Sequence, residues 1–95
     1  MQIEFDAAKQ AKTLAERGLD FRDAARVFAG VFVTIDDQRA DYGEQRFITV
    51  GQLGDRVLVL VWTPRGEDGD IAHLISARKA VHHEYKAWQS RYQKR

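Results

Sequence analysis

The spacing of apolar residues in the N-terminal third of the chain predicts two helices. Asp6 stands at an N-cap position, and Gly18 supplies the stop for a first helix between them. The apolar face of this helix is made of small residues, which suits close packing on another element: Ala7, Ala8, Ala11, Leu14 and Ala15. A second helix is expected from Asp20 to Gly30, with an apolar stripe of Phe21, Ala24, Ala25 and Phe28. Ahead of both, Ile3 and Phe5 alternate with polar residues and leave room for a short strand.

The middle of the chain changes to the pattern of strands. β-Branched and aromatic residues predict strands over 31–35, 46–53, 56–63 and 71–76. The run from Val57 to Trp62 is apolar without interruption, which is typical of a central strand covered on both faces. Residues 36–44 are polar and acidic, so we expect a mobile loop there.

The C-terminal segment predicts a final helix. Val81, Tyr85, Trp88 and Tyr92 recur on one face, and Ser76 is the expected N-cap. This aromatic stripe is more often core than a platform for stacking bases. The predicted elements, in chain order, are two helices, four strands and a final helix. We therefore expect an α+β domain in which helices pack an antiparallel four-stranded sheet.

Composition limits the class of protein. With 95 residues, the chain is expected to form a single domain, over residues 1–95. Cysteine is absent, which excludes disulfides, thiolate nucleophiles and cysteine-ligated metals. No apolar run approaches the roughly 20 residues that span a bilayer, so we expect no membrane association and a cytoplasmic location.

The charges nearly cancel in total but are segregated along the chain. The sequence holds 15 basic and 14 acidic residues. Residues 36–70 carry four basic and eight acidic side chains, whereas residues 71–95 carry six basic and one acidic. A cationic end of this kind is expected of a surface that binds polyanions, and a solvated helix face gives the same pattern.

Several chemistries lack the residues they need. The histidines His73, His82 and His83 do not have the spacing of a metal site, and are expected to be surface residues. Neither a GxSxG elbow nor a phosphate-binding glycine loop is present. We therefore expect no metal and no cofactor.

Arginines at strand ends are the remaining candidates for chemistry. In consecutive antiparallel strands, Arg46 and Arg65 lie at the same end of the sheet, whereas Arg78 and Lys79 lie at the opposite end. Near a phosphate, such cations stabilise the charge of a pentavalent transition state. Scattered arginines on a small sheet domain are more often solvated side chains, so this pattern alone does not assign a function.

Six segments spread over nearly the whole chain carry a further signal. They are FDAAK at 5–9, GLDFRDA at 18–24, GEQRFITVG at 43–51, TPRG at 63–66, LISARKA at 74–80, and the pair Glu84-Tyr85. Together they resemble the BrnT-type ribonuclease toxins of bacterial type II toxin–antitoxin systems. The resemblance implies a compact fold related to RelE toxins and RNA cleavage that inhibits translation. It also implies neutralisation by a BrnA-type antitoxin, with operator DNA bound only through the antitoxin complex.

The resemblance also implies a site. The catalytic positions carried over from it are Arg46, Arg65, Arg78, Lys79, Glu84 and Tyr85, and the RNA-binding positions are Lys9, Arg17 and His73. The cations bind phosphate and stabilise charge, while Glu84 or Tyr85 transfers protons, and the sequence leaves that choice open. The implied reaction needs no cofactor, because the RNA 2′-OH attacks the adjacent phosphate and leaves a cyclic phosphate.

Some positions depart from the family pattern. Thr13 stands where relatives carry Asn, Glu16-Arg17 where they carry Lys-His, and His73 where they carry Arg. The departures either shift proton transfer to His73 or leave a catalytically weak or inactive protein. In the second case the chain acts as an antitoxin-binding corepressor subunit, which is the alternative function. For both functions we expect the antitoxin to lie against the sheet edge and the terminal helices, burying the arginines.

Overall fold

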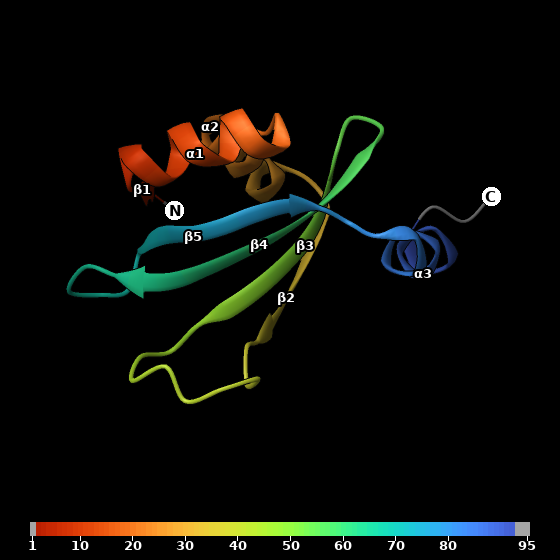
Figure 1. Cartoon of the computed structure of the whole chain (residues 1–95). Coiled ribbons are helices and arrows are strands. Elements are labelled where there is room, and N and C mark those ends of the chain that lie inside the picture. Colours follow the sequence, from red (N-terminus) through yellow and green to blue (C-terminus); the bar gives the residue numbers. More distant parts are fainter. Residues whose placement is uncertain (1, 93–95) are drawn as a thin grey trace.

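The structure is a computed structural model and describes residues 2–92. Its elements in chain order are β1 (Gln2–Phe5), α1 (Ala7–Arg17), α2 (Phe21–Ala24), the 3₁₀ helix η1 (Ala25–Ala29), β2 (Phe32–Asp36), β3 (Phe47–Leu53), β4 (Arg56–Arg65), β5 (Ile71–Lys79) and α3 (His82–Tyr92). The predicted α+β class is confirmed, with helices at both ends of the chain and the sheet strands between them (Figure 1).

The sheet has five strands rather than the predicted four. Their order is β1-β5-β4-β3-β2, and the three pairs from β2 to β5 are antiparallel, as expected. The fifth strand is the short segment at the N-terminus, which pairs in parallel with β5 from Gln2↔Ile71 to Phe5↔Leu74. The sheet is therefore mixed, because one of its four strand pairs is parallel and the other three are antiparallel.

The two faces of the sheet differ in what covers them. Helices α1 and α2 lie on one face, while α3 lies beyond the end of β5 (Figure 1). The core lies under α2 and η1, where Phe21 and Val27 pack against Leu58, Leu60 and Trp62 of β4. β4 is the middle strand, and its apolar run is buried except for the half-buried Val61, as predicted. We call the face away from α1 and α2 the outer face.

A buried hydroxyl on the inner face has two hydrogen-bond partners. The Thr49 hydroxyl is fully buried, accepts a hydrogen bond from Trp62 Nε1 at 2.8 Å, and bonds to the Thr34 hydroxyl at 2.7 Å. This chain of bonds links β2, β3 and β4 side by side. Gly51 lies on β3, and a Cβ added at this glycine would collide with the Val27 side chain. The 3₁₀ helix η1 therefore packs directly on β3.

Two predictions about the N-terminal helices need correction. The small-residue face of α1 is not buried, and Leu14 remains 44% exposed. The helix instead turns Gln10 and Thr13 toward the sheet, because Lys9 and Arg17 bond to β5 and fix its orientation. The second helix is α-helical only over Phe21–Ala24 and continues as η1, with Asp20 capping its start as expected.

The last strand is longer than predicted, and the last helix is shorter. β5 continues to Lys79 because pairing with β4 runs on to Leu58↔Lys79. Ser76 is therefore a strand residue and not a helix cap. Glu84 does the capping, since its carboxylate accepts from the Val81 backbone N–H at 2.8 Å. Of the aromatic stripe on α3, only Trp88 is buried, whereas Tyr92 is 38% exposed.

A β-bulge in β5 decides which side chains face outward. Val61 pairs with Ser76 and Trp62 with Leu74, so Ile75 has no partner on β4. The extra residue allows both Leu74 and Ala77 to enter the core. In consequence Ser76 and Arg78 point to the outer face.

Candidate active site

The outer face carries a hollow of about 370 Å³ at the centre of the sheet. Its floor is apolar and its rim is charged; the lining residues are Ile35, Arg39, Ile48, Val50, Val59, Val61, Ser76, Arg78 and Glu84. We call this hollow the sheet pocket. Four strands and α3 contribute to it, so it exists only in the folded sheet.

Arg78 and Glu84 form a bidentate ion pair at the rim of the sheet pocket. Arg78 NH1 donates to Glu84 Oε1 at 2.7 Å, and NH2 donates to Oε2 at 3.0 Å. The hydrogen bond from Arg78 is the main reason that the pKa of Glu84 falls to about 2, and the bond from the Val81 N–H adds to it. Glu84 is thus fully charged at neutral pH and holds the guanidinium of Arg78 in one orientation.

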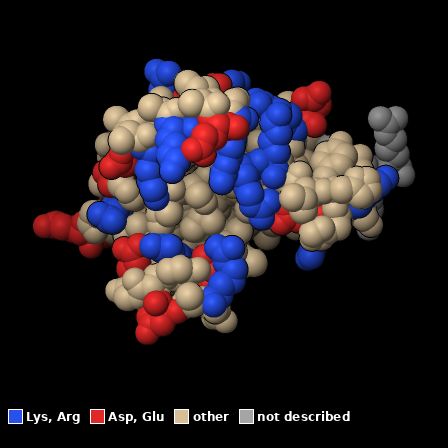
Figure 2. Space-filling model, viewed as in Figure 1, with Lys and Arg blue, Asp and Glu red and all other residues tan. Residues whose placement is uncertain are grey.

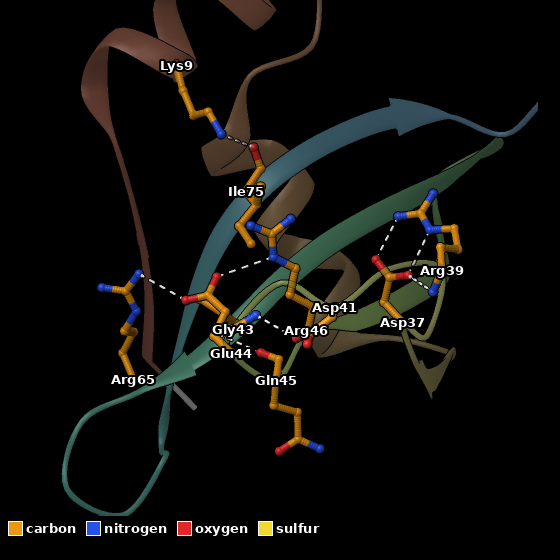
Figure 3. A network of polar contacts seen from close by, with 11 residues as sticks. Lys9, Asp37, Arg39, Asp41, Gly43, Glu44, Gln45, Arg46, Arg65 and Ile75 are labelled. Atoms are coloured by element: carbon orange, nitrogen blue, oxygen red, sulfur yellow. Dashed lines mark hydrogen bonds and ion pairs between the residues drawn. The ribbon is translucent and has the colours of Figure 1, made fainter.

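A second cluster lies at the end of the sheet where β3 begins and β4 ends. Glu44 lies between two arginines, 3.3 Å from Arg46 Nε and 3.9 Å from Arg65 NH2 (Figure 3). The Arg46 guanidinium also lies 4.0 Å from the centre of the Tyr42 ring, a cation–π contact. The expected convergence of Arg46 and Arg65 is confirmed, and Arg78 lies in a different cluster, as strand order required.

His73 lies on the outer face beside this second cluster. It pairs across the sheet with Thr63 of β4 and with Glu4 of β1. His73 Nδ1 lies 2.7 Å from Glu4 Oε1. An ionised carboxylate only accepts, so Nδ1 is the donor and Nε2 of a neutral ring is free to accept a proton.

Cations also follow the edge of β5 on the side of α1. Beyond Leu74 this edge has no strand partner in the described part of the chain. Side chains from α1 bond to its carbonyls: Lys9 Nζ donates to Ile75 O at 3.2 Å and Arg17 NH1 to Ala77 O at 2.9 Å. With Lys12 they line a second hollow of about 260 Å³, which shares Ser76 with the sheet pocket. Figure 2 shows Lys and Arg gathered over α1 and β5, with an uncharged surface below them.

Four of the six predicted catalytic residues do not line the sheet pocket. Arg46 and Arg65 form the second cluster, whereas Lys79 and Tyr85 belong to neither cluster. Lys79 pairs with the inward-facing Leu58 and so points to the opposite face from Arg78. Tyr85 follows Glu84 on α3, where successive side chains diverge by about 100°, and it does not line the pocket.

Two polar residues of the sheet pocket, Ser76 and Arg39, are not among the site residues predicted from the sequence. The sequence predicts Ser76 as a helix cap, whereas it lies within β5 and its side chain lines the pocket. Arg39 lies in the acidic segment that was expected to be a mobile loop. A local signal existed there, because Asp37-Gln38-Arg39 repeats the Asp-x-Arg spacing of Asp20-Phe21-Arg22. Among residues 2–92, no three His, Asp or Glu side chains are grouped as metal ligands would be.

Comparison with known families decides what this surface belongs to. The model of a family described as the ribonuclease toxin BrnT of type II toxin–antitoxin systems matches residues 5–84, from the end of β1 to the first turn of α3. The chain belongs to the BrnT family. Both arginine clusters, with Glu84, lie within the matched range. No curated protein sequence matches the chain.

Family membership gives the activity and the kinds of partner. BrnT proteins are ribonuclease toxins, so RNA is the substrate and a cognate antitoxin is the protein partner. None of the helices within residues 2–92 is long and apolar enough to cross a bilayer. The BrnT assignment also explains why a small sheet domain presents several arginines on one face.

Proposed function

We propose that this BrnT toxin is a metal-independent endoribonuclease that inhibits translation in the cytoplasm, with RNA lying across the outer face of the sheet. The observation that carries the proposal is that Arg46, Arg65 and Arg78 all lie on this face, in two clusters at opposite ends of the same strands. Guanidinium groups bind phosphate oxygens through paired donors, so two clusters at opposite ends of the sheet suit phosphates several nucleotides apart on one RNA strand.

The arginines bind RNA and stabilise the reacting phosphate. Each keeps N–H donors that its carboxylate partner does not use, and these donors face the developing charge. Lys9 and Arg17 bind flanking RNA around the β5 edge, because Ser76 lines both hollows and joins the two surfaces. Lys79 and Tyr85 receive no role in this proposal, since neither belongs to an arginine cluster or lines either hollow.

His73 is the base that we propose for proton transfer. A general base works best with a pKa near the working pH, and the pKa of Glu84, about 2, leaves that carboxylate a poor proton acceptor. Nε2 of neutral His73 takes the proton of the ribose 2′-OH while Glu4 holds the ring. The 2′-oxygen then bonds to phosphorus and the bond to the 5′-oxygen breaks. The products are a 2′,3′-cyclic phosphate and a 5′-hydroxyl, which takes its proton from solvent.

The test is cleavage of a labelled single-stranded RNA by the purified chain. We expect Arg78→Ala and His73→Ala each to lower the rate by about 100-fold or more. His82→Ala is the matched control, because His82 is exposed at the start of α3. A wild-type chain that leaves RNA intact at stoichiometric concentration would refute the proposal, as would full activity of the His73 variant for the role of that base.

The antitoxin surface that we propose is the free edge of β2. Within residues 2–92, β2 pairs with β3 alone, and all five residues of β2 are exposed. Val33 is 36% exposed and Ile35 is 59% exposed. Residues 31–35 contain no charged residue or proline, which are the residues that commonly prevent an edge strand from pairing with another chain. A BrnA-type antitoxin that adds an extended segment here would pair the free backbone groups, and the complex would bind operator DNA through the antitoxin. Slowed amide hydrogen exchange in β2 on mixing is the expected result; unchanged exchange there would exclude this edge.

The same exposed edge favours the second candidate function, a non-catalytic corepressor subunit. Both functions predict antitoxin binding, and they differ in the effect of the chain alone. Expression without antitoxin is expected to arrest growth and degrade RNA, and Arg78→Ala is expected to relieve both. Normal growth with intact RNA at a demonstrated level of folded protein would favour the corepressor.

A further inference from the structure

Arg39 lies on the sheet pocket and has no part in the function described so far. It comes from the loop between β2 and β3, whereas Arg78 and Glu84 reach the same pocket from β5 and α3. The pocket is thus bordered by two arginines that come from different sides of the sheet.

Arg39 is held in place by a buried carboxylate. Asp37 Oδ1 accepts from Arg39 Nε at 2.7 Å and Oδ2 accepts from NH2 at 2.7 Å (Figure 3). The Asp37 side chain is fully buried, while that of Arg39 is 62% exposed. The Asp37 backbone N–H also donates to Arg46 O at 2.8 Å, which ties the pair to the start of β3. The ion pair is therefore built into the frame of the sheet.

The pairing leaves donors of Arg39 unused. The guanidinium has five N–H groups in a rigid fork, and Asp37 takes one from Nε and one from NH2. The hydrogen bonds from Arg39 hold the pKa of Asp37 at about 2, so the carboxylate is charged at neutral pH. The Tyr42 side chain also interacts with this pair. The remaining N–H groups of Arg39, on NH1 and NH2, are the donors that an anion in the sheet pocket would use.

Arg78 repeats this arrangement on the other side. Glu84 accepts from NH1 and NH2 of Arg78, and Nε stays available. The two guanidinium groups also repel each other: Glu84 raises the pKa of Arg78, and the positive charge of Arg39 opposes that rise. Two cations that share a pocket, each with its carboxylate behind it, are stabilised by an anion placed between them. RNA supplies that anion as a phosphodiester.

We propose that Arg39 binds a backbone phosphate of the RNA across the sheet pocket from Arg78. The proposal rests on the function proposed above and adds a phosphate contact that the resemblance did not supply. Its ligand chemistry is a phosphodiester of single-stranded RNA, matched by the fork geometry of an arginine that is already oriented.

The experiment measures binding of a fluorescent single-stranded RNA whose 2′-hydroxyls are methylated, so that binding is separated from cleavage. We expect Arg39→Ala to raise Kd at least tenfold. We also expect the slope of log K against log salt to fall by about 0.7, the value for one lost phosphate contact on a single strand. Arg39→Lys keeps the charge and loses the fork, so it should keep the wild-type slope while raising Kd severalfold.

Arg22→Ala is the matched control. Asp20 and Arg22 have the same Asp-x-Arg spacing and the same contacts, Nε to Oδ1 at 3.2 Å and NH2 to Oδ2 at 2.9 Å, but they lie at α2 on the other face. This variant should bind RNA as the wild type does.

Wild-type affinity and slope in both Arg39 variants would overturn the proposal. If Arg39→Ala does not fold, Arg39→Lys decides alone, and a wild-type Kd for that variant overturns the proposal. Failure of the proposed function gives a different result from failure of this proposal. In that case the wild-type chain does not cleave unmodified RNA in the cleavage assay, but its binding of methylated RNA still depends on Arg39.

Discussion

The ion pair between Glu84 and Arg78 makes a prediction about how stability depends on pH. Glu84→Gln keeps the size of the side chain and removes its charge. A fall in pKa from 4.5 to about 2 corresponds to roughly 3 kcal/mol of interaction with the charged form. The Glu84 side chain is 28% exposed and that of Arg78 is 39% exposed. Solvent screening at such exposure reduces the expected loss of unfolding free energy to about 1–2 kcal/mol at pH 7.

The sign of the pH effect follows from the lowered pKa. A carboxylate whose pKa is lowered by folding contributes stability above its unfolded pKa and loses it as pH falls toward the folded value. For Glu84 the window runs from 4.5 down to about 2. The wild type should therefore approach the stability of Glu84→Gln across this range, while the two differ by a constant amount above it.

The assay is urea unfolding of both proteins at several pH values from 7 to 2, since urea does not screen charges. Glu67→Gln is the control, because Glu67 is exposed in the turn between β4 and β5, and its effect should stay within about 0.5 kcal/mol. A difference between wild type and Glu84→Gln that is the same at pH 7 and pH 2 would refute the reasoning.

Three further predictions concern packing, buried polar groups and metal. Gly51→Ala places a Cβ against the Val27 side chain and should cost about 1–3 kcal/mol in urea unfolding. Gly30→Ala, whose Cβ meets nothing nearer than 3.9 Å, should cost less, and equal losses would contradict the packing argument. Thr49→Val removes the acceptor of the Trp62 N–H and should lower the unfolding free energy by about 1–3 kcal/mol, which a wild-type urea midpoint would disprove. Adding EDTA should leave the RNA cleavage rate unchanged, and a rate that falls and then recovers with Mg²⁺ would refute metal independence.

Features set by local patterns were predictable from the sequence. The apolar run of β4 identified the central strand, and Asp6 and Asp20 identified two helix starts. The convergence of Arg46 and Arg65 needed only the antiparallel order of two neighbouring strands.

Features set by contacts between distant residues were not predictable. The parallel pairing of β1 with β5 joins segments about 70 residues apart in the sequence, and no local signal marks that pairing. The orientation of α1 depends on bonds from Lys9 and Arg17 to β5, which outweigh its own small-residue stripe. Arg39 belongs to the sheet pocket only because Asp37 is buried at the end of β2.

The β-bulge at Ile75 affects how sequences of this family should be aligned. A relative that lacked this one residue would have a regular β5, with Leu74 and Ala77 still inward and Arg78 still on the outer face. A relative that kept the residue in a regular strand would present the lysine of LISARKA to the pocket instead. A one-residue gap at Ile75 is therefore structurally neutral, whereas a gapless alignment against a regular strand pairs residues that lie on opposite faces of the sheet.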